Sequence, residues 1–136
     1  MVKQLVHDPV FLAQPSQDAG SEDLDIATDL RDTLQAHLSG CVGMAANMIG
    51  ERKRIIAFVQ ERQIRVMFNP RLLEKKGEYT AEEGCLSLNG VRSVKRANTI
   101  RVSYQDERMR THIQTLHGFT AQIVQHEMDH CSGILI

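Results

Sequence analysis

Two histidines four residues apart near the end of the chain form its strongest chemical motif, His126-Glu127-Met128-Asp129-His130. On an α-helix such residues project from one face, one turn apart, so both imidazoles can bind a single metal ion. Glu127 lies between them, where its carboxylate can take a proton from a water molecule that the ion activates. Two ligands do not make a catalytic metal site, so this interpretation requires a third.

The third ligand is expected upstream, because only six residues follow His130 and the familiar zinc proteases supply theirs downstream. The candidates that carry ligating side chains are His7, His37, His112, His117, Cys85 and several carboxylates. Cys85 follows a glycine, which permits a close backbone approach, and its thiolate could bind the ion. A buried structural cysteine is the alternative interpretation.

A third segment, from Cys41 to Gly50, is rich in glycine and other small residues. It follows a predicted helix, and a loop of this composition can bring its backbone close to a ligand. The alternative is a plain connection between a helix and a strand.

These three segments together resemble the peptide deformylase family, which carries G-x-G-x-A-A-x-Q, E-G-C-L-S and Q-H-E-x-D-H motifs. The second motif is intact from Glu83 to Ser87 and the third from Gln125 to His130, and the resemblance covers nearly the whole chain. It implies that one divalent ion is bound by Cys85, His126 and His130. Fe(II) is the metal that the family favours, and zinc, nickel or cobalt can occupy the same kind of site.

The implied reaction removes the N-formyl group from the N-terminal methionine of newly made polypeptides. Glu127 would be the acid–base, and the backbone amide of Leu86 would donate to the oxyanion. The resemblance also implies that Gly43 presents its backbone to the peptide and that Val42 lines the methionine pocket. Arg92 lies where relatives have a substrate-contacting arginine, and a solvated surface arginine is the alternative.

Two residues depart from the first family motif. Cys41 replaces its first glycine, and Met48 replaces the glutamine, whose amide donates a hydrogen bond to the formyl oxygen as charge develops. A thioether has no donor, and loss of one such donor typically costs roughly 3–4 kcal/mol. Asn47 is adjacent, but a shift of one residue turns a side chain elsewhere. We therefore expect the metal site to form, and we expect either that turnover of formyl peptides is weakened or that the enzyme prefers another acyl substrate.

Three other interpretations remain open at this stage. The chain could be a catalytically silent member that holds a metal and binds peptide N-termini. It could hold a structural zinc ion with Cys41 as fourth ligand, or it could cleave peptide bonds, for which the downstream ligand is missing. In the family, Arg96 would pair with Glu83 and brace the cysteine loop.

Length and composition set the frame for this chemistry. A chain of 136 residues and 15.3 kDa fits one domain, residues 1–136. Its net charge of −1 gives no electrostatic footprint for nucleic acid, and no apolar run is long enough to span a membrane. Without a signal peptide we expect a cytoplasmic protein. Ribosome docking through a helix beyond the metal motif is not expected, because the chain ends first.

The elements that position these residues are those of an α+β domain. The first twenty residues are expected to be irregular, and an amphipathic helix is predicted from Ser21 to Gly40. Apolar runs at 55–59 and 64–68 predict a hairpin that ends at Asn69-Pro70, and further strands are predicted at 100–104 and 113–116. After Gly118 the period becomes helical. We expect antiparallel strands packed around this C-terminal metal-binding helix.

Overall fold

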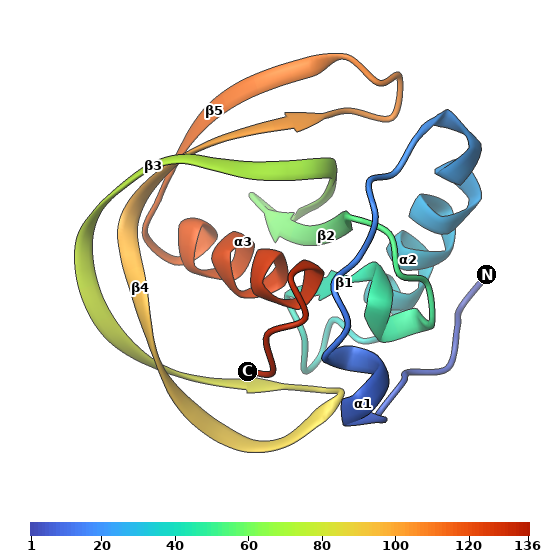
Figure 1. Ribbon diagram of the computed structural model, residues 1–136, viewed down its shortest axis with the longest axis horizontal. Helices are drawn as coiled ribbons and strands as arrows, with labels where there is room; N and C mark the ends of the chain where they lie inside the picture. Colours follow the sequence, from blue (N-terminus) through green and yellow to red (C-terminus); the bar gives the residue numbers. More distant parts are fainter.

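Helix α3 (Gly118–Cys131) lies in the middle of the fold, and an antiparallel sheet curves around it (Figure 1). The computed structural model describes residues 1–136. The five strands are neighbours in the order of the chain: β1 (Gly43–Ala45), β2 (Ile55–Gln60), β3 (Gln63–Cys85), β4 (Leu88–Gln105) and β5 (Thr111–His117). The predicted α+β class, with antiparallel strands around a C-terminal helix, is confirmed.

Strands β3 and β4 form one long ribbon closed by the two-residue turn at Leu86 and Ser87. Its register shifts between Phe68 and Arg71, between Leu72 and Glu74, and between Gly84 and Cys85. Such irregularities bend a strand pair and increase its twist, which lets the ribbon wrap around α3 (Figure 1). The sequence predicted only the start of β3 and the end of β4. The rest of the ribbon is largely exposed to solvent and lacks an apolar alternation.

Two apolar clusters lie on opposite faces of the sheet. Strand side chains alternate between faces, so Ile56 packs in the cluster with α3, whereas Ile55 packs in the cluster with α2 (Leu24–Ala36). The first cluster includes Phe58, Met67, Ile100, Val102, Leu116, Ala121 and Val124. The second includes Leu30, Leu34, Met44, Met48, Ala57 and Phe68. Helix α3 is therefore fixed along its length by the sheet that surrounds it.

The N-terminal part departs from the prediction in its details. A short helix, α1 (Pro9–Leu12), lies within the segment expected to be irregular, and the Asp8 carboxylate caps it by accepting from the Val10 amide at 2.9 Å. The predicted amphipathic helix exists, but a 3₁₀ turn, η1 (Ser21–Asp23), precedes it, so Ser21 is not its cap. The helix also ends at Ala36, four residues before the predicted stop.

The middle of the chain brings two further corrections. The hairpin of β2 and β3 is confirmed, but Asn69-Pro70 does not end the second strand. The two residues fall instead at a register shift, with Asn69 at φ 54°, and β3 continues beyond them. The expected loop from Cys41 to Gly50 contains β1 and a 3₁₀ turn, η2 (Ala46–Ile49). No helix is both long and apolar enough to cross a membrane.

Candidate active site

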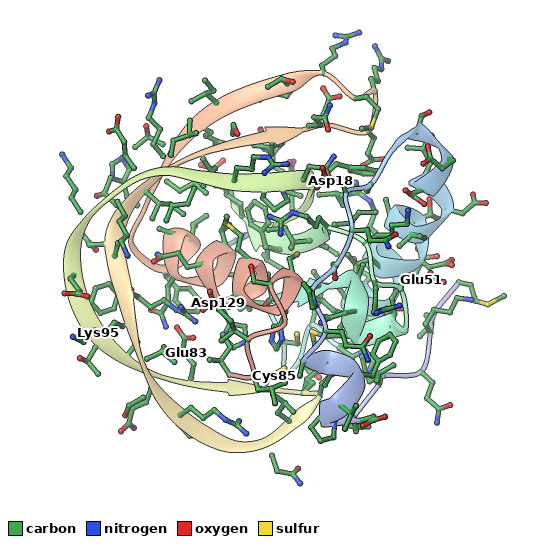
Figure 2. All side chains as sticks on the ribbon, viewed as in Figure 1. Asp18, Glu51, Glu83, Cys85, Lys95 and Asp129 are labelled. Atoms are coloured by element: carbon green, nitrogen blue, oxygen red, sulfur yellow. The ribbon has the colours of Figure 1, made fainter.

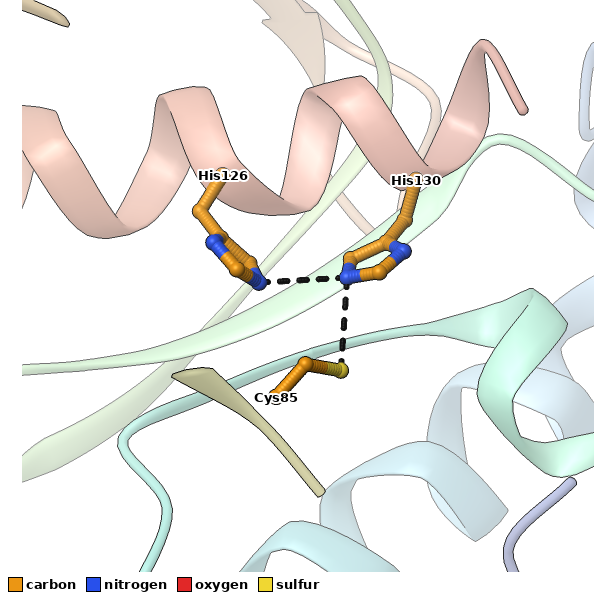
Figure 3. Close-up of side chains that lie close together, drawn as sticks. All are labelled: Cys85, His126 and His130. Carbon is orange, nitrogen blue, oxygen red and sulfur yellow. Dashed lines mark hydrogen bonds between the residues drawn. The ribbon is translucent and has the colours of Figure 1, made fainter. Parts of the chain in front are cut away.

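Cys85, His126 and His130 converge beneath α3 (Figure 3). Their ligand atoms, one sulfur and two imidazole nitrogens, all lie within 4.8 Å of one another. Cys85 Sγ lies 3.5 Å from His130 Nε2, and the two Nε2 atoms are 3.1 Å apart. Tetrahedral zinc geometry would place a sulfur and a nitrogen about 3.6 Å apart and two nitrogens about 3.3 Å apart. The donor set therefore fits one metal ion.

The remaining ligand candidates are not part of this group. His7, His37, His112, His117 and Cys41 all lie outside the convergent set. The interpretation with Cys41 as a fourth zinc ligand is therefore not supported. Instead, the Cys41 thiol donates to the Gly43 carbonyl oxygen at 2.8 Å, and burial raises its pKa to about 11. Cys131 is buried, which raises its pKa to about 12, as expected for a packed cysteine.

A carboxylate behind this group of residues orients one of its two histidines. Glu83 Oε1 accepts from His126 Nδ1 at 2.8 Å, which turns Nε2 of that ring towards the ligand group. The same carboxylate receives three guanidinium hydrogen bonds from Arg96, one from Nη2 at 2.7 Å and two from Nε at 3.0 and 3.2 Å, and one from the Gln122 amide at 2.9 Å. Burial alone would raise the pKa of Glu83, but the hydrogen bonds from His126 and Arg96 lower it to about 2. Glu83 is thus held as a carboxylate.

Arg96 also ties the cysteine ribbon to the helix. Its Nη1 donates to Asp129 Oδ2 at 2.7 Å, while its other nitrogens donate to Glu83. Figure 2 shows Glu83 and Asp129 between α3 and the ribbon. The pairing of Arg96 with Glu83 follows the expectation. The contacts of Glu83 with His126 and of Arg96 with Asp129 were missed, because no local spacing relates these positions.

Glu127, next to His126 in the sequence, is buried, and its Oε1 has no hydrogen-bond partner. Burial raises the pKa of this carboxyl to about 7. Its other oxygen lies against Gly43: a Cβ built at that glycine would be 2.8 Å from Glu127 Oε2 and 2.6 Å from Ile123 Cγ2. Glycine is therefore required at position 43 for β1 to approach α3 this closely.

A cavity of about 630 Å³ opens beside the ligands and Glu127. The predicted residues Val42, Gly43, Met48 and Leu86 line it, together with Cys85, His126 and Glu127. Arg92 does not; its guanidinium donates to the Asn89 carbonyl oxygen at 3.2 Å on the ribbon. Phe119 and Ile123 were missed, although helical spacing could have identified them: Ile123 lies three residues before His126 and four before Glu127, and Phe119 lies four residues before Ile123.

Met48, which replaces the glutamine of the first motif, and its neighbour Asn47 face different ways. Met48 is buried and lines the cavity, with its thioether sulfur 3.5 Å from the Ala45 amide nitrogen. Asn47 turns towards the end of α3, where its Nδ2 donates to the His130 carbonyl oxygen at 3.0 Å. The side chain at position 48 thus offers no hydrogen-bond donor to the cavity, and its neighbour does not replace it.

Comparison with known proteins agrees with this geometry. A family model described as polypeptide deformylase matches residues 4–136. The chain belongs to the polypeptide deformylase family. A peptide deformylase from Clostridium beijerinckii is 50% identical over 136 residues, which cover the whole of both chains. Another deformylase, from Thermus thermophilus, is 38% identical and aligns with 97% of this chain and 78% of its own.

Solved deformylase structures share the fold. The class I type b peptide deformylase from Acinetobacter baumannii, bound to Met-Ala-Ser, superposes with a TM-score of 0.90 at 28% identity, covering 99% of this chain and 97% of the other. The crystal structure of the Thermus thermophilus enzyme gives a TM-score of 0.86 at 33% identity, with 99% and 83% covered. The protein is therefore a hydrolase that removes the N-formyl group from newly made polypeptides, it belongs to a metal-dependent family, and it contains a group of residues that could bind a metal.

Proposed function

We propose that Cys85, His126 and His130 hold one divalent ion, Fe(II) in the cell, and that Glu127 moves the proton during deformylation. The observation that carries this proposal is the convergence of the three ligand atoms beside a buried, unpartnered carboxylate at the wall of a cavity. When bound, the ion would supply Lewis acidity to water and to the formyl carbonyl. One thiolate and two imidazoles also suit zinc, nickel or cobalt.

The protein residues supply the remaining steps. The Glu127 carboxylate accepts a proton from the attacking water and returns it to the nitrogen as the C–N bond breaks, which releases formate and a free amine. The cavity at Val42 and Phe119 receives the apolar side chain of the formyl-methionyl residue. The Leu86 amide donates to the oxyanion, and Gly43 lets the peptide backbone approach. Because the substrate is a newly made polypeptide, we place the protein in the cytoplasm.

The test is formate release from a formyl-methionyl peptide by protein purified without oxygen and loaded with Fe(II). The metal of the purified protein is measured at the same time, by elemental analysis. We expect turnover by the wild type and loss of turnover in Glu127→Gln with the metal content unchanged. Metal binding without any formate release would favour the silent, peptide-binding alternative.

Position 48 limits the rate in this proposal. A glutamine there would add an amide donor to the cavity wall, and one oxyanion donor is worth roughly 10²–10³-fold in rate. Met48→Gln is expected to raise kcat/KM on formyl-methionyl peptides towards that range. Met48→Leu, which changes the shape but adds no donor, is the control and should give no gain. A gain below about threefold for Met48→Gln contradicts the oxyanion argument.

A further inference from the structure

The two histidine ligands differ in what holds the ring nitrogen that faces away from the ligand group. In both residues Nε2 lies in the group, so Nδ1 carries the proton when a metal is bound, and a hydrogen-bond acceptor is needed there. His126 Nδ1 donates to Glu83. His130 Nδ1 is buried and has no hydrogen-bond partner.

Asn47 is a buried polar side chain that contacts His130 from outside the helix. It lies in η2 with only 1% of its surface exposed, and its Nδ2 donates to the His130 carbonyl oxygen. Its Oδ1 is also buried and without a partner. The reverse orientation of the amide would set Oδ1 against that carbonyl oxygen, acceptor against acceptor, so the hydrogen bond fixes which end is the oxygen. An unsatisfied acceptor and an unsatisfied donor therefore lie on two residues in direct contact.

We propose that Asn47 is a positioning residue of the metal centre that holds His130 at two points. Its amide N–H fixes the backbone of the last helical turn, and its amide oxygen accepts the Nδ1–H of the same histidine through one buried water molecule. A single water joins two polar groups that are too far apart for a direct hydrogen bond, and burial between complementary groups is where such waters are found. The inference rests on the proposed role of His130 as a ligand.

In η2, two adjacent side chains point towards different parts of the structure. Met48 faces the cavity, and Asn47 faces the end of α3. The turn is held by Gly50, whose amide donates to the Asn47 carbonyl oxygen at 3.1 Å and whose φ of 90° suits glycine. The turn η2, which forms part of the wall of the substrate cavity, therefore also supports His130, as Glu83 supports His126.

The first test is the zinc affinity of the metal-free protein, measured by competition with a chromophoric chelator. Loss of an acceptor behind a ligating histidine typically weakens metal binding by roughly 10–100-fold, and we expect this for Asn47→Leu. Asn47→Asp keeps the acceptor and loses the donor, so its melting temperature should fall while its zinc affinity stays within about threefold of the wild type. An affinity of Asn47→Leu within about twofold of the wild type overturns the proposal.

A matched control removes a different unpartnered oxygen near the same end of α3. Ser16 Oγ is buried without a partner, and the Ser16 amide donates to the Cys131 carbonyl oxygen at 2.8 Å. Ser16→Ala should leave the zinc affinity unchanged. If Ser16→Ala weakens zinc binding and Asn47→Leu does not, the acceptor has been assigned to the wrong residue and the proposal fails.

The second test needs no variant. In the zinc-loaded wild type, labelled at the histidine nitrogens, nuclear magnetic resonance should show slowly exchanging Nδ1 protons for both His126 and His130. A His130 Nδ1 proton that exchanges freely with solvent overturns the inference, even if Asn47→Leu does not fold. If the wild type binds no zinc, both the proposed metal site and this inference are wrong. If the wild type binds zinc and Asn47→Leu has the same zinc affinity, only this inference is wrong.

Discussion

Gly43→Ala tests how closely β1 must approach α3, the helix that carries the proposed acid–base Glu127. Gly43 lies in β1 with no positive φ, so alanine meets no backbone strain there. The obstacle is space, because the new methyl group would be placed against Glu127 Oε2 and Ile123 Cγ2. Both of these atoms belong to the face of α3 that lines the cavity.

The size of the effect follows from the distances. Non-bonded carbons rest about 3.5–4.0 Å apart. A Cβ placed 2.6 Å from Ile123 Cγ2 therefore requires β1 and α3 to move apart by about 1 Å at this point. Overpacking of this kind costs roughly 1–3 kcal/mol of stability. A displacement of about 1 Å at a catalytic group costs on the order of 10²-fold in rate. We therefore expect kcat to fall by about 100-fold while the metal is retained.

The assay is kcat for formate release, measured with metal content and melting temperature on the same preparations. Gly40→Ala is the matched control, since a Cβ at Gly40 meets nothing within 4 Å although the residue borders the same cavity. This control should behave as the wild type. If Gly43→Ala keeps kcat within about threefold of the wild type, β1 can move away freely and the close approach is not a requirement.

Two further predictions concern charged side chains. Glu83→Gln leaves a weaker acceptor for His126 Nδ1, so zinc affinity measured by chelator competition should fall roughly 10–100-fold; an unchanged affinity would show that the carboxylate does not tune this ligand. The hydrogen bond from His112, with those from two backbone amides, lowers the pKa of Asp106 to about 2. Its charge therefore stabilises the fold above the unfolded pKa of about 4, and this contribution is lost as the pH falls towards 2. The melting temperature of Asp106→Asn should lie below that of the wild type at pH 5 and converge with it near pH 2; a constant difference would contradict this.

The parts of the site that the sequence predicted depend on local spacing or on an intact motif. His126 and His130 share a helix face because they are four residues apart, and the motif around Cys85 identified the sulfur that meets them. The pairing of Arg96 with Glu83 came from the same resemblance. The shared helix face follows from the spacing alone, whereas the other two relations came from the resemblance and depend on the fold.

What the sequence could not predict depends on the path of the ribbon. The outer parts of β3 and β4 face solvent, so neither face has an apolar pattern, and their length follows from pairing with each other. The contact of Glu83 with His126 exists only because that ribbon returns to α3. Asn69-Pro70 was interpreted as a strand end, since sequence does not distinguish a break from a bulge. The orientation of Asn47 likewise requires the turn of η2.

The position of the proposed sulfur ligand, Cys85, at the end of the long ribbon has a consequence for folding. About 40 residues separate it from the first imidazole along the chain, and an ion bound to both would tether that stretch as a disulfide does. For a loop of this length, the conformational freedom denied to the unfolded chain corresponds to about 4 kcal/mol. An ion bound by the proposed ligands would then also hold the fold together, and a chelator would destabilise the protein as well as inactivate it.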